Sequence, residues 1–274
     1  MTPPPTASIV LVGGGNMGSA MLDGWLAHGV ATASICVVEP AAINAAVVAG
    51  RGVTVVADPA LLSASPVPEI IVLAVKPQAI DALLPAYTHF AARGAVVLSI
   101  AAGKTIAGLT HGLGGGAAVV RAMPNSPASI RLGISVACAN AHVSQVQRER
   151  CGELLACVGS VLWVDDERLL DAVTAVSGSG PAYVFLLAEC LARAGVEAGL
   201  PSAVAERLAR ETVAGAGALL SRSPLPVHTL RGNVTSPGGT TAAALSVLMA
   251  EDGLQPLLTR AVSAATLRAG ELAG

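Results

Sequence analysis

The sequence contains few aromatic and few charged residues. Aromatic side chains make up 2% and charged side chains 12% of its 274 residues, whereas hydrophobic residues make up 53%. The 16 basic and 18 acidic side chains give a net charge of −2, and no basic block occurs, so nucleic acid is not an expected partner. A chain this apolar has more hydrophobic surface than one monomer buries, so we expect contacts between subunits.

Metal-ligand and disulfide patterns are missing as well. The 5 cysteines show no CxxC or other ligand spacing, and the 5 histidines stand alone in the sequence. This argues against a metal site of the common kinds. We expect the cysteines to be mostly small buried hydrophobes in a reducing compartment.

Signals for export and for membrane insertion are also missing. Residues 1–8 carry 3 prolines and no basic residue, unlike a signal peptide. The longest charge-free runs are interrupted by Pro, Gly or Asn, so none is expected to cross a membrane. The sequence therefore predicts a soluble, cytoplasmic protein.

A glycine-rich motif follows the first apolar run. Residues 8–12 are β-rich, residues 13–18 read Gly-Gly-Gly-Asn-Met-Gly, a helical pattern covers 19–28, and a second β-rich run over 35–38 ends at Glu39. This order is typical of a dinucleotide-binding βαβ unit, in which the acid lies about 20 residues past the last glycine. Gly13 permits the tight turn, Gly15 the approach of the pyrophosphate, and Gly18 close packing of the helix on the strand.

Glu39 bears on the choice of cofactor. A carboxylate at this position hydrogen-bonds a ribose 2′-OH and repels a 2′-phosphate, and no arginine follows before Arg51. Taken alone, this favours NADH over NADPH. A solvent-facing glutamate at the end of a strand is the alternative, so NADPH and NADH both stay open as the cofactor.

The α/β pattern continues to residue 164. Further strands are expected over residues 53–56, 70–75, 95–100, 118–122, 134–138 and 161–164, with a helix over 144–157. Ligands of open α/β sheets bind outside the carboxyl ends of the strands, so Lys76 is expected to face a cofactor, with a plain surface lysine as the alternative. After the next strand, the small residues Ala101 and Ala102 permit the close approach of a flat ligand.

From Asp165 the pattern changes to helices with hardly any strand signal. Asp165, Asp166 and Glu167 resemble the acidic first turn of a helix, although Glu167 could also face a cleft. Residues 177–181, Ser-Gly-Ser-Gly-Pro, are expected to break this helix before a new one begins. We therefore expect an α/β, Rossmann-like dinucleotide-binding domain over residues 1–164, followed by an all-α domain over residues 165–274.

A second candidate site lies late in the helical half, where residues 233–241 read Asn-Val-Thr-Ser-Pro-Gly-Gly-Thr-Thr. Pro237 fixes φ for a turn, and the two glycines after it reach backbone angles closed to other residues. Hydroxyl groups crowd the start of a predicted helix, where free N–H groups carry a partial positive charge. This predicts a pocket for a small anion such as a carboxylate, with an ordinary N-cap after a Pro-Gly turn as the alternative.

Five stretches resemble the pyrroline-5-carboxylate reductase family and stand in the family's order. They are GGGNMG (13–18), AVKPQ (74–78), RAMPNSPA (121–128), DAVTAVSGSGPAYVF (171–185) and NVTSPGGTTAAAL (233–245). The last two are long and specific, and together the five cover both halves of the chain. The resemblance implies hydride transfer from NADPH or NADH to the C=N carbon of 1-pyrroline-5-carboxylate, which gives L-proline in the last step of proline biosynthesis.

The resemblance also implies which residues contact the two ligands. It places the substrate carboxylate at Ser236, Gly238 and Gly239, and makes Thr241 the catalytic hydroxyl that hydrogen-bonds the ring nitrogen. Asn233, Thr240 and Glu167 are implied beside the substrate. The implied cofactor contacts, with Glu39 added from its position, are Gly13, Gly14, Gly15, Asn16, Met17, Gly18, Glu39, Ala74, Val75, Lys76, Pro77, Ile100, Ala101 and Ala102. The helical half of this family forms intertwined dimers, so a homodimer or a higher homo-oligomer is implied.

Two alternatives stay open. Another imine or hydroxy-acid reductase could share the two-domain plan, but hydroxy-acid enzymes of that plan typically use a lysine in the helical domain, and no lysine follows Asp165. A regulatory protein that binds the cofactor without catalysis would not need the hydroxyl groups around Gly238.

Overall fold

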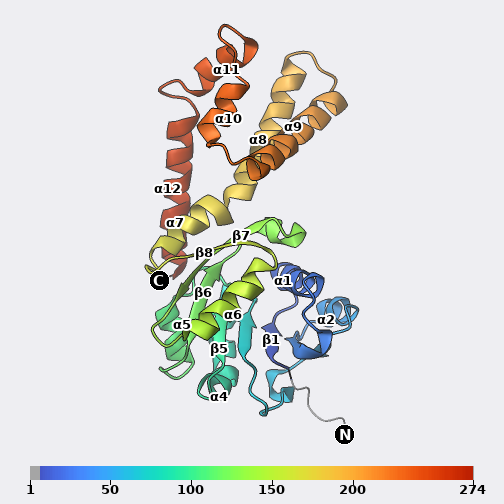
Figure 1. The fold of residues 1–274 in the computed structure, drawn as a ribbon, viewed down its shortest axis with the longest axis vertical. Helices are drawn as coiled ribbons and strands as arrows, with labels where there is room; N and C mark the ends of the chain where they lie inside the picture. Colours follow the sequence, from blue (N-terminus) through green and yellow to red (C-terminus); the bar gives the residue numbers. More distant parts are fainter. Residues whose placement is uncertain (1–6, 274) are drawn as a thin grey trace. The chain divides into compact units, whose positions relative to one another are not determined.

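The strands of the N-terminal half form one sheet (Figure 1), described here from a computed structural model that covers residues 7–273. The strands of this described part are β1 (Ile9–Val12), β2 (Ile35–Val38), β3 (Thr54–Val56), β4 (Ile70–Leu73), β5 (Val96–Ser99), β6 (Val119–Met123), β7 (Gly133–Ala139) and β8 (Gly159–Trp163). Their order in the sheet is β3-β2-β1-β4-β5-β6-β7-β8. The first six run parallel, whereas β7 is antiparallel to β6 and parallel to β8.

Helices cover both faces of this sheet and build a hydrophobic core on each. Because side chains alternate along a strand, Ile9 and Leu11 face one core, whereas Val10 and Val12 face the other. The first core is closed by α1 (Asn16–Ala27), α2 (Ala42–Ala49) and α6 (Gln145–Ala156). The second is closed by α3 (Pro77–Leu83), α4 (Thr88–Ala91) and α5 (Ile106–Gly112). The continuous apolar runs in the sequence are explained by this burial on two sides.

The strand order reverses between β1 and β4, which lie side by side in the sheet. From β1 the chain moves outward through β2 to β3, and it then returns to β4 on the other side of β1. In open α/β sheets this switch point marks the ligand-binding edge, at the carboxyl ends of the strands. The glycine-rich loop follows β1 at this edge, and Ala74 follows β4, with its N–H donating to the carbonyl of Val12 at 2.8 Å.

The remainder of the described chain is helical. Its elements are α7 (Leu169–Val173), a π-helical turn (Thr174–Gly178), α8 (Gly180–Glu197), α9 (Ser202–Arg222), α10 (Val227–Asn233), α11 (Thr240–Leu248) and α12 (Leu254–Ala273). The α/β class of the first half and the helical class of the second are thus confirmed. The helix break predicted over residues 177–181 coincides with an element boundary: the π-helical turn ends at Gly178, and α8 begins at Gly180 with Ser179 as its N-cap residue. Pro181 lies in the first turn of α8, where an N–H has no acceptor within the helix to lose.

Two compact units make up the chain. One contains the residues up to Gly178 together with those from Ala265 on, and the other contains Ser179–Ala264. We call them the sheet unit and the helical unit. The helical unit buries little of its own apolar surface: no residue of α8 is buried, and in α9 only Ala205 and Ala209 are.

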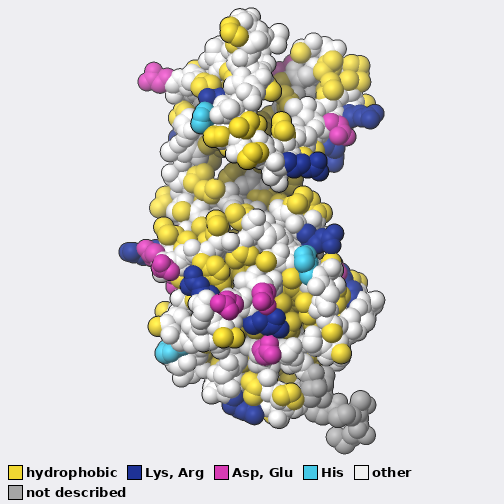
Figure 2. Space-filling model, viewed as in Figure 1, with side chains coloured by type: hydrophobic (Ala, Val, Ile, Leu, Met, Phe, Trp, Pro, Cys, Tyr) yellow, Lys and Arg dark blue, Asp and Glu magenta, His cyan; other side chains and the backbone are white. Residues whose placement is uncertain are grey.

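Large hydrophobic side chains remain exposed on the helical unit. Phe185 is 62% exposed, and Figure 2 shows further hydrophobic side chains at the surface of these helices. The stretch Leu169–Glu197 is also the one helix of the described residues that is long and apolar enough to cross a membrane, judged by length and composition alone. Apolar surface on this scale is typical of a chain that associates with other copies of itself.

Candidate functional site

The glycine-rich loop forms the first part of the candidate site. Gly13 has φ of 101°, a conformation that favours glycine, and its N–H donates to the carbonyl of Val38. A side-chain carbon on Gly18 would come within 2.1 Å of the Gly13 carbonyl oxygen, so α1 can pack this closely only with glycine there. By contrast, no atom lies within 4 Å of the corresponding position on Gly15. That open side leaves room for a ligand group beside the backbone.

The start of α1 is suited to a phosphate group. Gly15 is the N-cap residue and no side chain caps the helix, so the first N–H groups, from Asn16 and Met17 on, are free of a side-chain acceptor. Free N–H groups and the helix dipole together attract anions. The glycine-rich loop therefore fits the pyrophosphate of a dinucleotide, as the sequence predicts.

Glu39 lies beneath this loop. It is buried, with an exposed fraction of 6%, and its Oε2 accepts a hydrogen bond from the N–H of Gly14 at 2.7 Å. Its Oε1 accepts from the N–H of Ala41 at 2.8 Å. The alternative of a solvent-facing glutamate at a strand end is therefore not what the structure shows. Glu39 links the end of β2 to the glycine-rich loop, a role that its sequence position alone did not indicate.

The loops after β4 and β5 lie at the same edge of the sheet. Ala74, Val75 and Pro77 are partly buried, whereas Lys76 is exposed and precedes the first residue of α3. In the next loop Ile100 and Ala101 are buried and Ala102 is partly buried, with the N–H of Ile100 donating to the carbonyl of Leu73. The structure thus brings the predicted cofactor contacts of the sheet unit to one edge, after β1, β2, β4 and β5.

An ion pair between a buried arginine and a partly buried glutamate lies in the same unit. Nη1 of Arg121, from β6, is 2.8 Å from Oε1 of Glu167, and Nη2 of Arg121 is 3.8 Å from Oδ1 of Asp171. The same Oε1 of Glu167 accepts from the N–H of Ile106 at 2.8 Å. Sequence reasoning placed Glu167 beside the substrate and missed Arg121. The signal was available, because an arginine within the apolar run 118–122 is costly to bury without a partner.

In the helical unit, the predicted anion pocket is a loop that leads into α11. Asn233 is the last residue of α10, Gly238 has φ of 70°, and Gly239 is the N-cap of α11 without a side-chain cap. Ser236 lies beside Gly239: its carbonyl accepts from the Gly239 N–H at 3.1 Å, and its Oγ would lie 2.5 Å from a side-chain carbon placed on Gly239. The loop therefore brings one hydroxyl to an uncapped helix start, which is the geometry that a carboxylate needs.

The two threonines at the helix start differ in exposure. Thr240 is exposed and Thr241 is partly buried. A partly buried hydroxyl close to free N–H groups can donate to a second atom of a ligand whose carboxylate is bound there. The arrangement of Ser236, Gly238, Gly239 and Thr241 is thus compatible with a ligand that carries a carboxylate next to a basic atom.

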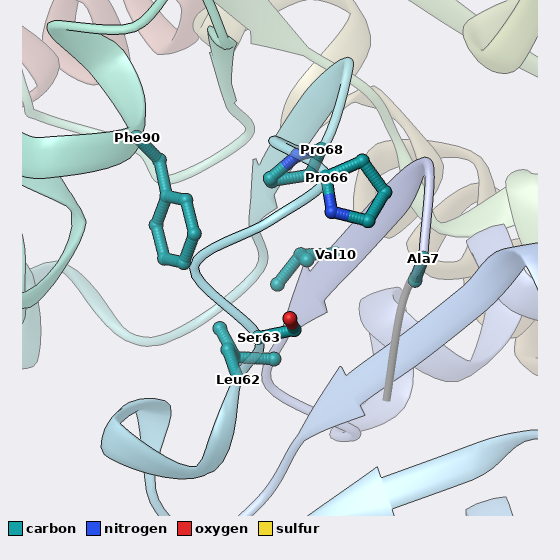
Figure 3. Close-up of a pocket in the computed structure, with 7 residues that line it drawn as sticks. All are labelled: Ala7, Val10, Leu62, Ser63, Pro66, Pro68 and Phe90. Atoms are coloured by element: carbon teal, nitrogen blue, oxygen red, sulfur yellow. The ribbon is translucent and has the colours of Figure 1, made fainter. Parts of the chain in front are cut away.

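A small cavity and an open groove lie away from the predicted ligand contacts. A cavity of about 10 Å³ in the sheet unit, lined by residues such as Val10, Leu62 and Phe90, has room for about one water molecule at most (Figure 3). An open groove of about 510 Å³ in the helical unit is lined by residues of α10 and α11 and by Thr235, but by none of the predicted substrate contacts. Among the described residues, no three His, Cys, Asp or Glu side chains gather as metal ligands would.

The fold and the glycine-rich edge define the chain as a dinucleotide-binding oxidoreductase with a separate helical unit. Comparison with known families agrees: residues 8–103 match the model described as "NADP oxidoreductase coenzyme F420-dependent", and residues 167–272 match "Pyrroline-5-carboxylate reductase dimerisation". The pyrroline-5-carboxylate reductase of Pseudomonas aeruginosa is 43% identical over 269 residues, which cover 98% of this chain and 97% of that protein.

Solved structures give the same result. The pyrroline-5-carboxylate reductase of Coxiella burnetii superposes with a TM-score of 0.92 at 35% identity, over 98% of this chain and 99% of that one. The Plasmodium falciparum enzyme, solved with NADP bound, has a TM-score of 0.82 at 27% identity, over 98% and 99% of the two chains. The chain belongs to the pyrroline-5-carboxylate reductase family.

Proposed function

We propose that the chain holds a reduced nicotinamide cofactor, NADPH or NADH, in the loops after β1, β2, β4 and β5, and its substrate in the loop before α11. The reaction is that of its family, the reduction of 1-pyrroline-5-carboxylate to L-proline in the last step of proline biosynthesis. Membership of the family, across nearly the whole chain, is the observation that carries this conclusion.

The substrate site of this proposal uses the uncapped start of α11. The substrate carboxylate is held by Ser236 and by the backbone of Gly238 and Gly239, with Asn233 and Thr240 beside it. Free N–H groups at a helix start bind a carboxylate without the cost of bringing in a buried cation. The uncapped N-cap position of Gly239 and the partly buried Thr241 support this placement.

Thr241 is the proposed catalytic residue. When bound, the nicotinamide supplies a hydride to the C=N carbon of the substrate, and the electron pair of the C=N bond moves to the ring nitrogen, which takes up a proton. The hydroxyl of Thr241 donates a hydrogen bond to that nitrogen as its charge changes. Such a preorganised donor, together with positioning, accounts for most of the rate that this chemistry needs.

The cofactor site of this proposal comprises the glycine-rich loop (Gly13–Gly18), Glu39, Ala74–Pro77 and Ile100–Ala102. The open side of Gly15 and the uncapped start of α1 support the pyrophosphate position. The enzyme of Plasmodium falciparum was solved with NADP bound, which supports a nicotinamide dinucleotide at this edge.

The dimerisation match implies a homo-oligomer, and the exposed apolar side chains of α8 suit this association. We propose a homodimer or a higher homo-oligomer, located in the cytoplasm, with no nucleic acid or membrane as partner. We also propose that the helical domain begins at residue 165, where the strand pattern ends, while its first residues up to Gly178 pack with the sheet unit.

A spectrophotometric assay tests the proposed function. The purified chain is mixed with 1-pyrroline-5-carboxylate and either NADPH or NADH, and the loss of absorbance of the reduced nicotinamide is followed. We expect oxidation of the cofactor with formation of an equal amount of L-proline. Oxidation of neither cofactor by the folded, oligomeric protein would contradict the proposal.

A further inference from the structure

Arg121 occupies an unusual position in the middle of β6. Its side chain is 6% exposed, and its neighbours in the strand, Val120 and Ala122, are buried hydrophobic residues. A buried guanidinium group is stable only when carboxylates or other acceptors satisfy it. Glu167 provides this acceptor at 2.8 Å, with Asp171 farther away at 3.8 Å.

Glu167 in turn accepts a hydrogen bond from the backbone N–H of Ile106, at the end of the loop that follows β5. The oxygen that accepts from Arg121 also accepts from the N–H of Ile106, the first residue of α5, at 2.8 Å. Residues 100–105 form the loop that ends at Ile106. The other end of that loop is fixed through the N–H of Ile100, which donates to the carbonyl of Leu73 at 3.1 Å.

The middle of the same loop is fixed by packing. Gly103 has φ of 73°, and a side-chain carbon there would lie 2.7 Å from the carbonyl oxygen of Leu272 near the end of α12. The loop is therefore held at its start by the sheet, in its middle by Leu272 and at its end by Glu167. A second charged contact, between Lys104 of the loop and Asp81 of α3 at 2.7 Å, is more exposed than the pair of Arg121 and Glu167.

We propose that Arg121 and Glu167 are positioning residues for the nicotinamide cofactor, acting through Ile106 on the loop of residues 100–105. This rests on the proposed function, which places Ile100, Ala101 and Ala102 against the cofactor. Arg121, Glu167 and Ile106 all belong to the sheet unit, as the glycine-rich loop does, whereas residues 233–241 belong to the helical unit. In this proposal Glu167 acts on the cofactor loop rather than on the substrate.

Direct titration of the purified protein with NADPH and with NADH, followed by protein or nicotinamide fluorescence, tests this role. We expect Glu167→Ala and Arg121→Met each to weaken nucleotide binding about tenfold, the effect of losing one hydrogen bond to a charged group. Glu167→Gln keeps an oxygen that accepts from Ile106, so we expect it to bind within about threefold of the unchanged protein. The KM for 1-pyrroline-5-carboxylate, at saturating cofactor, is expected to change less than about twofold in all three.

Coupling between the two residues is a further test. If Arg121 acts through Glu167, adding Arg121→Met to Glu167→Ala weakens binding no more than about twofold further. A loss close to the product of the two single effects would overturn the proposal. Arg121→Lys, which keeps the charge but not the planar fork, is expected to weaken nucleotide binding about threefold, and unchanged binding in this variant would also overturn it.

The matched control is Asp166→Ala, which removes an exposed carboxylate next to Glu167 that pairs with Arg168. It should leave nucleotide binding unchanged. A tenfold rise in the KM for substrate with unchanged nucleotide binding, in Glu167→Ala or in the milder Glu167→Gln, would show that Glu167 contacts the substrate and would overturn the inference. Because the titration needs no substrate, it reports on the pair even if the unchanged protein fails to reduce 1-pyrroline-5-carboxylate.

Discussion

The N–H of Gly14 donates to Oε2 of Glu39 at 2.7 Å, across 25 positions of sequence. The second oxygen of this carboxylate accepts from the N–H of Ala41. A carboxylate has about four lone-pair positions, so two remain for a ribose hydroxyl. Glu39 therefore fixes the glycine-rich loop, and we propose that its remaining acceptor positions also meet the ribose of a dinucleotide.

We expect Glu39→Ser to relax any preference for NADH over NADPH. Loss of the charge removes the repulsion of a 2′-phosphate, and loss of the link to Gly14 weakens the binding of both nucleotides, by about tenfold for NADH. Nucleotide titrations of the variant and of the unchanged protein give the ratio of the dissociation constants for NADH and NADPH. Glu149→Ser, which removes an exposed acid of α6, is the charge-matched control. If the unchanged protein already prefers NADPH, the ribose role of Glu39 is wrong.

Thr241→Ala is expected to lower kcat for 1-pyrroline-5-carboxylate about tenfold or more, the size of one hydrogen bond made in the transition state. Nucleotide binding should stay the same, since Thr241 is not among the proposed nucleotide contacts. Thr259→Ala serves as control, because the hydroxyl of Thr259 bonds within α12 to the carbonyl of Gln255. Full turnover by Thr241→Ala would remove Thr241 from the mechanism.

Gly239→Ala is expected to raise the KM for substrate about tenfold. The added methyl would lie 2.5 Å from Oγ of Ser236, so the serine hydroxyl must leave the position in which we propose that it meets the carboxylate. Gly116→Ala is the control, since that exposed glycine has no atom within 4 Å of the added carbon. An unchanged KM in Gly239→Ala would mean that Ser236 does not bind the substrate.

The elements that the sequence predicted well are those with a local signal. The run Ile70–Leu73 is apolar because both of its faces are buried, and the glycines at 13 and 18 follow from the turn and the helix contact that they form. The π-helical turn before α8 could not be predicted, because Ser177 and Pro181 suit a helix break and a helix start equally well. The contacts of Glu39 and Glu167 were missed for another reason: each joins groups far apart in sequence, so only the folded chain reveals the partner.

The buried cysteines predict how stability changes in alkaline solution. Burial raises the pKa of Cys36 to about 11 and that of Cys151 to about 12, from a value of 9.0 in an exposed thiol. Both thiols thus stay protonated in the folded chain at pH values where the unfolded chain has lost the protons. The stabilisation that comes from these protonated thiols is fully present below pH 9. It is lost as the pH rises toward the pKa values of the thiols in the folded chain.

Between pH 9 and 11 each of these thiols should lower the free energy of unfolding by about 1.4 kcal/mol per pH unit. Urea unfolding at a fixed protein concentration, repeated at several pH values, measures the slope. Below pH 9 the double variant Cys36→Ala/Cys151→Ala should have a lower free energy of unfolding than the unchanged protein, because of the space left in the core. Its free energy of unfolding should then fall less steeply as the pH rises. Cys190→Ala, at an exposed position, should keep the original slope. Equal slopes in the double variant and the unchanged protein would show that these two thiols do not set the alkaline limit.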